Sequence, residues 1–366
     1  MNILFISNLD GQMHRGPNHS VPAQIKAVAN IDNVLWFNIC KQSPVIWKEQ
    51  KLPILSVNDI PSEKIEDLPA PFNKPDLFVF EQFYSFAKKV LFLNSIRKSS
   101  IPYIIIPRGE LTNKAQSHKF LKKKIANLLF FYKFAQGATA IQYLTKQEQQ
   151  DSDKKWNKNS FVIPNGVSLP IVSYKKSFIN KMKIVYIGRL DKYHKGLDLL
   201  LQACYKIKSL LQSLNVKIEL YGTDRTNDMA SLLEFINDYN IKDIISFHPA
   251  VFGEDKIKIL QQADIFIMTS RFEGHPMGLI EALAYGLPCL VTKGTNMKEE
   301  IESFDAGWTA DTTVESIADA LKKMISERNL FEQKSINARK LASQYNWDII
   351  AQKSHEIYEK IISEIK

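Results

Sequence analysis

Cysteine is scarce in this chain of 366 residues, and its few copies show no metal-binding spacing. The three cysteines, Cys40, Cys204 and Cys289, lie far apart in the sequence. This argues against a cysteine zinc site and against a disulfide framework. It is typical of a protein that works in a reducing cytoplasm.

Long apolar runs are also missing. No uninterrupted apolar stretch approaches the roughly 20 residues that a membrane-spanning helix needs. Residues 1–7 lack the basic start and the long apolar core of a signal peptide. We therefore expect a cytoplasmic protein without a transmembrane helix.

Acidic residues are missing from one part of the chain. Residues 1–170 carry 22 Lys/Arg and 13 Asp/Glu, whereas residues 171–366 carry 26 of each, so the whole net charge of +9 lies in the first half. Between residues 111 and 147 there are seven lysines and no acid. This asymmetry indicates that the N-terminal half meets something anionic.

Short apolar segments alternate with helical patterns along the whole chain. Segments such as 184–187 are continuously apolar, which is typical of strands buried on both faces of a parallel sheet that helices cover. The length allows two such domains. We expect an N-terminal domain over 1–168, a C-terminal domain over 180–346 and a last helix over 347–366. The expected strands are 3–7, 34–39, 77–80, 103–106, 138–144 and 161–163, then 184–188, 217–221, 244–247, 265–268, 289–292 and 307–310.

Two glutamates, Glu273 and Glu281, stand eight residues apart around a turn rich in Gly and Pro. An apolar strand precedes them, and Pro276 and Gly286 suit the first position and the C-terminal stop of a helix. The layout is strand, turn and helix N-terminus. In an open α/β sheet ligands bind at that edge, where free N–H groups attract anions.

Two cations, Arg189 and Lys195, follow the first strand of the second half and lie just before another helix. Arg offers a planar fork and Lys a mobile point charge, so the pair suits a diphosphate. No Asp-x-Asp pair ends an apolar strand candidate. We therefore expect no metal site and no obligatory metal or other cofactor.

These motifs resemble those of the retaining glycosyltransferases of family 4, with their Glu-x7-Glu element. The resemblance implies the α/β GT-B fold, two doubly wound Rossmann-like domains that face each other across a cleft. The C-terminal domain would hold a nucleotide sugar and the N-terminal domain the acceptor, with the last helix returning to the first domain. Glu273 would face the donor sugar, Glu281 would bind the ribose, and Arg189 and Lys195 would clamp the diphosphate.

The same resemblance implies a set of substrate contacts made mainly by backbone. We assign contacts with sugar hydroxyls and phosphate to the turn and helix start between the two glutamates. Thr223, after the next strand, and Val251, in a loop where relatives contact the base, would lie near the nucleotide. The residues of the turn and helix start are Gly274, His275, Pro276, Met277, Gly278 and Leu279.

In the first half, Gly16 and Arg108 are the matching positions. Gly16 lies in a long polar loop after the opening strand, where relatives bring backbone close to the diphosphate or acceptor. Arg108 ends another strand where many relatives have His, and it would hydrogen-bond sugar or phosphate.

The lysine-rich segment from Lys119 to Lys133 is helical by pattern. We expect Leu121, Ile125, Leu128 and Tyr132 to form its core-facing stripe, and Phe120, Phe131 and Phe134 to be exposed. Basic residues mixed with aromatics suit docking on anionic lipid, with about 1 kcal/mol for each cation near the surface. A solvated basic face is the alternative. No nucleic-acid motif accompanies the charge, so we expect no nucleic-acid partner.

The resemblance implies an enzyme that transfers a sugar with retention from a nucleotide-sugar donor, with a UDP-sugar favoured. The acceptor would be a hydroxyl of a glycan or lipid-linked glycan, in surface polysaccharide synthesis, on the inner face of the cell membrane. Three alternatives stay open. They are a non-catalytic scaffold of the same fold that assists another transferase, a nucleotide-sugar 2-epimerase or phosphorylase, and a peripheral lipid-binding protein.

Overall fold

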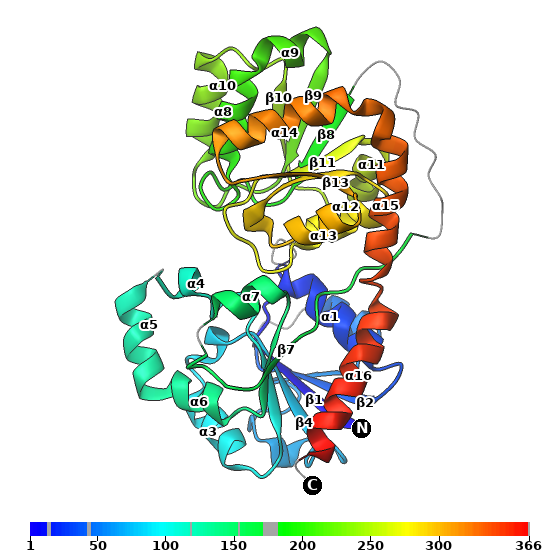
Figure 1. The fold of residues 1–366 in the computed structure, drawn as a ribbon. Helices are drawn as coiled ribbons and strands as arrows, with labels where there is room; N and C mark the ends of the chain where they lie inside the picture. The colour runs from blue at the N-terminus through cyan, green and yellow to red at the C-terminus, as the bar shows by residue number, and fades with distance from the viewer. Residues whose placement is uncertain (13–15, 42–44, 118, 153, 171–181, 365–366) are drawn as a thin grey trace. The chain divides into compact units, whose positions relative to one another are not determined.

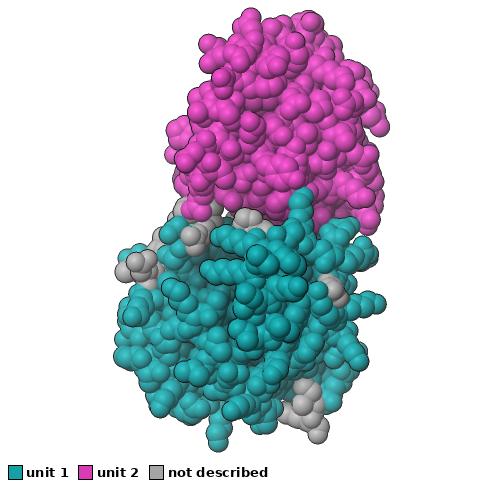
Figure 2. All heavy atoms as spheres, turned by 90° about the vertical axis from the view of Figure 1, so that its left-hand side faces the viewer, with its two compact units in different colours: residues 1–166, 347–366 teal, residues 167–346 magenta. Residues whose placement is uncertain are grey.

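The computed structural model describes residues 1–12, 16–41, 45–117, 119–152, 154–170 and 182–364. The chain divides into two compact units (Figures 1 and 2). Unit 1 consists of Met1–Gly166 with Trp347–Lys366, and unit 2 of Val167–Asn346. Residues 171–181, which include most of the stretch between the two expected domains, lie outside the described residues.

Unit 1 is built on a parallel sheet in the order β3-β2-β1-β4-β5-β6-β7. The six expected strands are confirmed, and one further strand, β3, lies at the edge. The strands are β1 (Asn2–Ser7), β2 (Asn33–Asn38), β3 (Ile54–Ser56), β4 (Leu77–Glu81), β5 (Tyr103–Ile106), β6 (Ala140–Tyr143) and β7 (Ser160–Val162).

Helices cover both faces of this sheet, because its strands carry apolar side chains on both faces and both sets must be buried. In β1, Ile3 and Phe5 belong to one core cluster and Leu4 and Ile6 to the other. The helices include α1 (Pro17–Val28), α2 (Val45–Glu49), α3 (Val90–Lys98), α4 (Asn113–Ser117), α5 (Phe120–Ala126), the π-helix η3 (Asn127–Phe131), α6 (Tyr132–Gly137), α7 (Lys146–Asp151) and α16 (Trp347–Ser363). The last of these, α16, packs beside α1 and adds Tyr358 to the first cluster (Figure 1).

Unit 2 repeats the plan with a six-stranded parallel sheet in the order β10-β9-β8-β11-β12-β13. Ile184 of the central strand pairs with Ile218 on one side and Ile265 on the other. The strands are β8 (Met182–Ile187), β9 (Val216–Tyr221), β10 (Ile245–His248), β11 (Ile265–Met268), β12 (Cys289–Thr292) and β13 (Gly307–Ala310). The helices are α8 (Leu197–Lys206), α9 (Lys208–Ser213), α10 (Met229–Asp238), α11 (Gly253–Gln262), α12 (Met277–Ala284), α13 (Lys298–Ser303), α14 (Val314–Ser326) and α15 (Phe331–Ser343).

The strand order of unit 2 reverses direction between β8 and β11. At such a switch point the connections after the two strands run to opposite faces of the sheet and leave a crevice at their carboxyl ends. The charged residues singled out in the sequence follow these two strands, Arg189 and Lys195 after β8 and Glu273 and Glu281 after β11. Sheet topology therefore brings together segments about 80 residues apart in the chain.

The orientation expected for the lysine-rich segment is wrong for five of its seven residues. Leu121, Ile125 and Leu128 are exposed, whereas Phe131 and Phe134 are buried. Phe120 is exposed and Tyr132 packs against the core, as expected. The segment packs through its aromatic residues onto the cluster that contains Phe80 and Phe83. No helix among the described residues has the length and apolar character to cross a membrane.

Candidate functional site

The loop after β8 carries Arg189 and Lys195, and it closes on the end of β11. Gly196 ends the loop with φ +62°, and a Cβ at this position would lie 2.1 Å from the carbonyl oxygen of Thr269. The Thr269 hydroxyl in turn donates to the Gly196 carbonyl at 3.1 Å. Only glycine allows this close approach, which brings the Lys195 side chain next to the loop after β11.

Lys195 and Glu273 form an ion pair, with Nζ 2.5 Å from Oε1. Ser270 donates its hydroxyl to the same oxygen at 2.6 Å. Burial raises the pKa of Glu273, but the charge of Lys195 and the hydrogen bonds from Lys195 and Ser270 outweigh it, so the pKa is lowered overall. The carboxylate is therefore ionised at neutral pH. An ammonium has three N–H donors, and the contact with Glu273 uses one of them.

Arg189 is held by a neutral histidine. Its Nη2 lies 2.8 Å from Nδ1 of His194, and Nε2 of the same ring lies 2.8 Å from the carbonyl oxygen of Phe272. A guanidinium only donates and a carbonyl only accepts, so the ring accepts at Nδ1 and carries its proton on Nε2. Burial and then the neighbouring Lys195 lower the pKa of His194 to about 4, which agrees with a neutral ring. The ring also stacks on Phe272 with centroids 4.0 Å apart.

A second arginine braces the two loops against each other. Arg271 makes two parallel hydrogen bonds of 2.7 Å to the carboxylate of Asp198 at the start of α8. Its backbone N–H donates to the carbonyl of His194 at 2.9 Å. Arg271 is thus committed to structure, and Arg189 and Lys195 are the cations of the site.

The helix that carries Glu281 begins one residue later than expected, because Pro276 is the N-cap of α12 and not its first residue. A Cβ at Gly278 would lie 3.0 Å from the carbonyl oxygen of Ile187, so the first turn of α12 packs closely on the end of β8. Glu281 forms an ion pair with Lys256 of α11, and both side chains are one-quarter exposed.

Some expected contact residues face the interior of unit 2. His275 is buried, its ring lies 5.0 Å from that of Tyr345, and burial lowers its pKa to about 3. Leu279 is fully buried, and its N–H donates to the carbonyl of Pro276 at 3.1 Å. The side chain of His275 and the N–H of Leu279 are thus engaged within the protein. Pro276, the residue between them that was also expected to contact the substrate, has no backbone N–H to donate. Gly274, Met277 and Gly278 are partly exposed.

The strand ends of β9 and β10 border the same edge of the sheet. Leu190 donates its backbone N–H to the carbonyl of Thr223 at 2.9 Å, which joins the loop after β9 to the loop after β8. Tyr221 stacks on His248 with centroids 4.7 Å apart. Val251 is partly buried against the core of unit 2.

In unit 1, Arg108 is an internal brace. Its side chain is only 5% exposed and its Nε donates to the fully buried carboxylate of Glu81 at 2.7 Å. Further bonds of 2.8–3.0 Å reach Ser20 and Gln24 of α1 and Asn165 after β7. These bonds use four of the five N–H donors of the guanidinium, so Arg108 braces the fold of unit 1. Its expected hydrogen bond to sugar or phosphate stays a prediction.

Gly16 is the N-cap of α1 with an ordinary helical φ of −49°. A Cβ at this position would meet nothing within 4 Å. The fold of unit 1 therefore does not demand glycine here. Its expected role in approaching a ligand stays a prediction.

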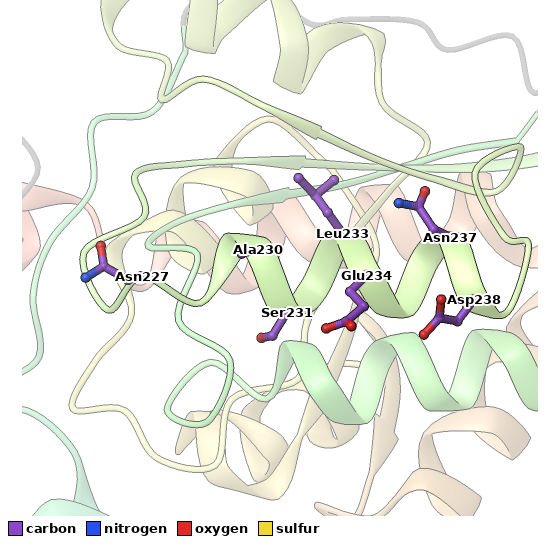
Figure 3. A pocket seen from close by; sticks show the side chains of 7 residues that line it. All are labelled: Asn227, Ala230, Ser231, Leu233, Glu234, Asn237 and Asp238. Carbon is purple, nitrogen blue, oxygen red and sulfur yellow. The ribbon is translucent and has the colours of Figure 1, made fainter.

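A shallow hollow on unit 2 runs along α10 between Asn227 and Asp238 (Figure 3). It is lined by α10 and by Asn227 just before it, and not by the carboxyl ends of strands, so it lacks the converging donors of a ligand site. Among the described residues, no three His, Cys, Asp or Glu side chains gather in a metal-binding group.

Sequence reasoning missed three polar residues of the site, namely His194, Ser270 and Lys256. His194 directly precedes Lys195, and Ser270 lies three residues before Glu273, so their proximity in sequence to predicted site residues was a usable signal. Lys256 lies on another helix 25 residues before Glu281, and no local pattern connects the two.

Comparison with solved structures identifies the architecture as GT-B. The chain is similar to sucrose-phosphate synthase from Thermosynechococcus elongatus, with a TM-score of 0.76 and 14% identity over 100% of both chains. It is also similar to HepE from Anabaena, solved in complex with UDP and with UDP-glucose, with a TM-score of 0.75, 16% identity and coverage of 98% of this chain and 100% of that one. The expected fold class, two Rossmann-like α/β domains of the GT-B type, is thus confirmed.

Residues 174–341 match the family described as glycosyl transferases group 1. Among curated proteins, the chain is 26% identical over 193 residues to a Campylobacter jejuni enzyme. That relative is named N,N'-diacetylbacillosaminyl-diphospho-undecaprenol alpha-1,3-N-acetylgalactosaminyltransferase, and the match covers 52% of this chain and 48% of the relative. The chain spans about half the length of the curated relatives that it first matches.

Proposed function

We propose that this protein is a retaining glycosyltransferase that moves a sugar from a nucleotide sugar to an acceptor hydroxyl. The observation that carries the proposal is the cluster at the switch point of unit 2. Arg189, Lys195, Glu273 and the N-terminus of α12 come together there, and Glu281 lies on the same helix. The match of residues 174–341 to glycosyl transferases group 1 supports the same function.

The cations and the helix start stabilise the leaving group. When the bond between the sugar and the phosphate breaks, negative charge grows on the nucleoside diphosphate. Arg189 and Lys195 meet this charge, and the first N–H groups of α12 add the positive end of the helix dipole. This arrangement neutralises the diphosphate with protein groups, so we propose that turnover needs no metal.

Glu273 orients the donor sugar. Lys195 and Ser270 both contact Oε1, so Oε2 is the oxygen that we assign to a sugar hydroxyl. The acceptor oxygen bonds to the anomeric carbon on the face that the phosphate leaves, and its proton passes to the departing phosphate oxygen. The configuration is then retained, and the carboxylate supports the positive character of the sugar without forming a bond to it.

We propose a UDP-sugar as donor, since HepE was solved with UDP and UDP-glucose. Glu281 would bind the ribose hydroxyls, held in place by Lys256. The acceptor we propose is a glycan or lipid-linked glycan at the cytoplasmic face of a membrane, in the synthesis of a surface polysaccharide. The name of the Campylobacter relative, which acts on a sugar linked to diphospho-undecaprenol, supports this class of acceptor.

Thermal unfolding with UDP, GDP, dTDP and ADP, each in EDTA and in Mg²⁺, tests the donor site. A nucleotide at 100 times its dissociation constant adds about 2.7 kcal/mol of stability. We expect one nucleotide, UDP, to raise the melting temperature in EDTA and to lose this effect in Glu281→Ala. If no nucleotide at millimolar concentration raises the melting temperature, the proposed enzymatic function is refuted and a non-catalytic scaffold is favoured. Conversion of the nucleotide sugar to its 2-epimer without acceptor would favour an epimerase.

A further inference from the structure

The segment formed by α5 and η3 presents an apolar face to solvent. Leu121, Ile125, Leu128 and Leu129 have the i, i+4, i+7, i+8 spacing of one helix face. They are 74%, 61%, 74% and 74% exposed, and the neighbouring Phe120 is 54% exposed. We call these five residues the apolar face. Large side chains gathered at this exposure mark a surface that meets an apolar partner.

The rest of unit 1 does not cover the apolar face. It is the opposite side of the segment that packs against the core of unit 1. Phe131 lies 4.9 Å from Phe83, and Phe134 lies 5.2 Å from Phe80, measured between ring centroids. The segment is thus anchored in the core, and in Figure 1 α5 stands at the outer edge of unit 1. The apolar face and the core face coexist on one helical segment.

Lysines border the apolar face. Lys119, Lys122, Lys124 and Lys133 are exposed, and no acid occurs between residues 111 and 147. The Lys124 ammonium lies 5.5 Å from the ring centroid of Phe120 and so extends along the apolar face. Lys123 is different, because its Nζ turns inward to the Ala115 carbonyl at 2.5 Å. Apolar side chains flanked only by positive charges suit the boundary between lipid headgroups and acyl chains.

We propose that the apolar face and its lysines dock unit 1 on an anionic lipid bilayer, with Leu121, Ile125, Leu128 and Leu129 inserted among the acyl chains. Charge complementarity selects this partner. A second copy would oppose lysines to lysines, and a nucleic acid would leave the apolar side chains without a partner. The argument for this docking surface uses only the exposure and charge of its residues. The use of the surface to reach a lipid-linked acceptor rests on the proposed function.

Co-sedimentation with vesicles tests the proposal. We compare phosphatidylcholine alone with an equal mixture of phosphatidylcholine and phosphatidylglycerol. The wild type should bind the mixture and release at high salt, since screening weakens the charge attraction. K122Q/K124Q should bind about 30-fold more weakly, about fivefold for each cation. L121Q/L128Q should bind at least about tenfold more weakly, because apolar insertion is lost.

The matched control is I336Q/K340Q, which changes an exposed Ile and an exposed Lys one turn apart on α15 of unit 2. It should bind the vesicles as the wild type does. Wild-type binding to neither vesicle, or equal binding by L121Q/L128Q, would overturn the proposal. Light scattering that shows a dimer abolished by L121Q/L128Q, without vesicle binding, would assign the face to a second copy instead.

Two further measurements separate this proposal from the others. The variant L128W should gain fluorescence quenching by brominated lipid over the wild type, and no gain would argue against insertion. Stabilisation by UDP in solution should be the same in wild type and L121Q/L128Q. UDP binding without vesicle binding would mean that the docking surface fails and the donor site does not. Vesicle binding without UDP binding would mean that the proposed function fails and the docking surface does not.

Discussion

Lys195 and Glu273 form an ion pair in unit 2, with Nζ 2.5 Å from Oε1, although 78 residues separate them in the chain. Their side chains are only 11% and 10% exposed. The pair keeps the carboxylate ionised and holds the ammonium at the switch point. Each residue therefore serves both the stability of unit 2 and the proposed chemistry, and variants must be designed to separate the two.

Lys195→Met should destabilise the protein and abolish transfer. Removing one partner of a buried ion pair costs about 3–5 kcal/mol, because the other charge stays buried alone. The double variant Lys195→Met with Glu273→Gln should recover most of this stability, since no lone charge remains. Urea unfolding measures the recovery, and turnover should stay about 100-fold or more below wild type in both variants. A double variant that regains activity would show that the pair is only structural.

Stability should fall as the pH is lowered from about 6.5 toward 4, through His194 and His275. Burial lowers the pKa of His194 from 6.5 to about 4 and that of His275 to about 3. Between these values the unfolded chain takes up protons that the folded chain does not, so unfolding is favoured as pH falls. Each histidine contributes up to about 1.4 kcal/mol per pH unit.

To check this pH dependence, the free energy of unfolding is measured against pH in wild type and His275→Gln, and the two slopes are compared. The variant should lose the contribution of one proton over that range. Identical slopes would mean that His275 takes up its proton over the same pH range in the folded and the unfolded protein, and that burial does not lower its pKa.

Arg108→Ala should act on folding and not on donor binding. The substitution leaves the fully buried carboxylate of Glu81, whose pKa burial raises, without its guanidinium. We expect a loss of about 3–5 kcal/mol. Arg108→Ala with Glu81→Gln should be more stable than Arg108→Ala alone. If the single variant melts like wild type but no longer binds nucleotide sugar, Arg108 is a substrate residue as the sequence suggested.

Lys256→Ala should raise the donor KM and change kcat little. Lys256 holds Glu281 but lies on another helix, so its loss frees the carboxylate to move. For a pair that is one-quarter exposed we expect up to about 1 kcal/mol, or about fivefold in KM. Lys258→Ala is the control, because Lys258 is 64% exposed on the same helix and pairs with Asp255. An equal effect in both variants would count against positioning by Lys256.

Much of the fold could be predicted from the sequence, because buried parallel strands are continuously apolar and alternate with helical patterns along the chain. The edge strand β3 was missed, since three residues, Ile54–Ser56, make too short a pattern. The orientation of α5 was predicted wrongly. Spacing shows that Leu121, Ile125 and Leu128 share a face, but not whether another element covers it.

The site could be predicted only in part. The motifs placed Arg189 and Glu273 after two strands, and the strand order brought those strands together. The contact of His194 with Arg189 depends on side-chain directions within one loop, and that of Lys256 with Glu281 on side-chain directions across two helices. Likewise, the burial of Arg108 follows from four partners on three separate segments, which no local pattern contains.

Calorimetric titration of UDP in EDTA tests the central claim most directly, with wild type, Arg189→Ala and Lys192→Ala side by side. Lys192 is an exposed cation of the same loop and serves as the matched control. We predict binding to wild type and Lys192→Ala with similar affinity, and a loss of about tenfold or more in Arg189→Ala, since a hydrogen bond to a charged group contributes about 1.5–3 kcal/mol. Equal affinity in all three proteins, or no binding to the wild type, would contradict a diphosphate site at the switch point of unit 2.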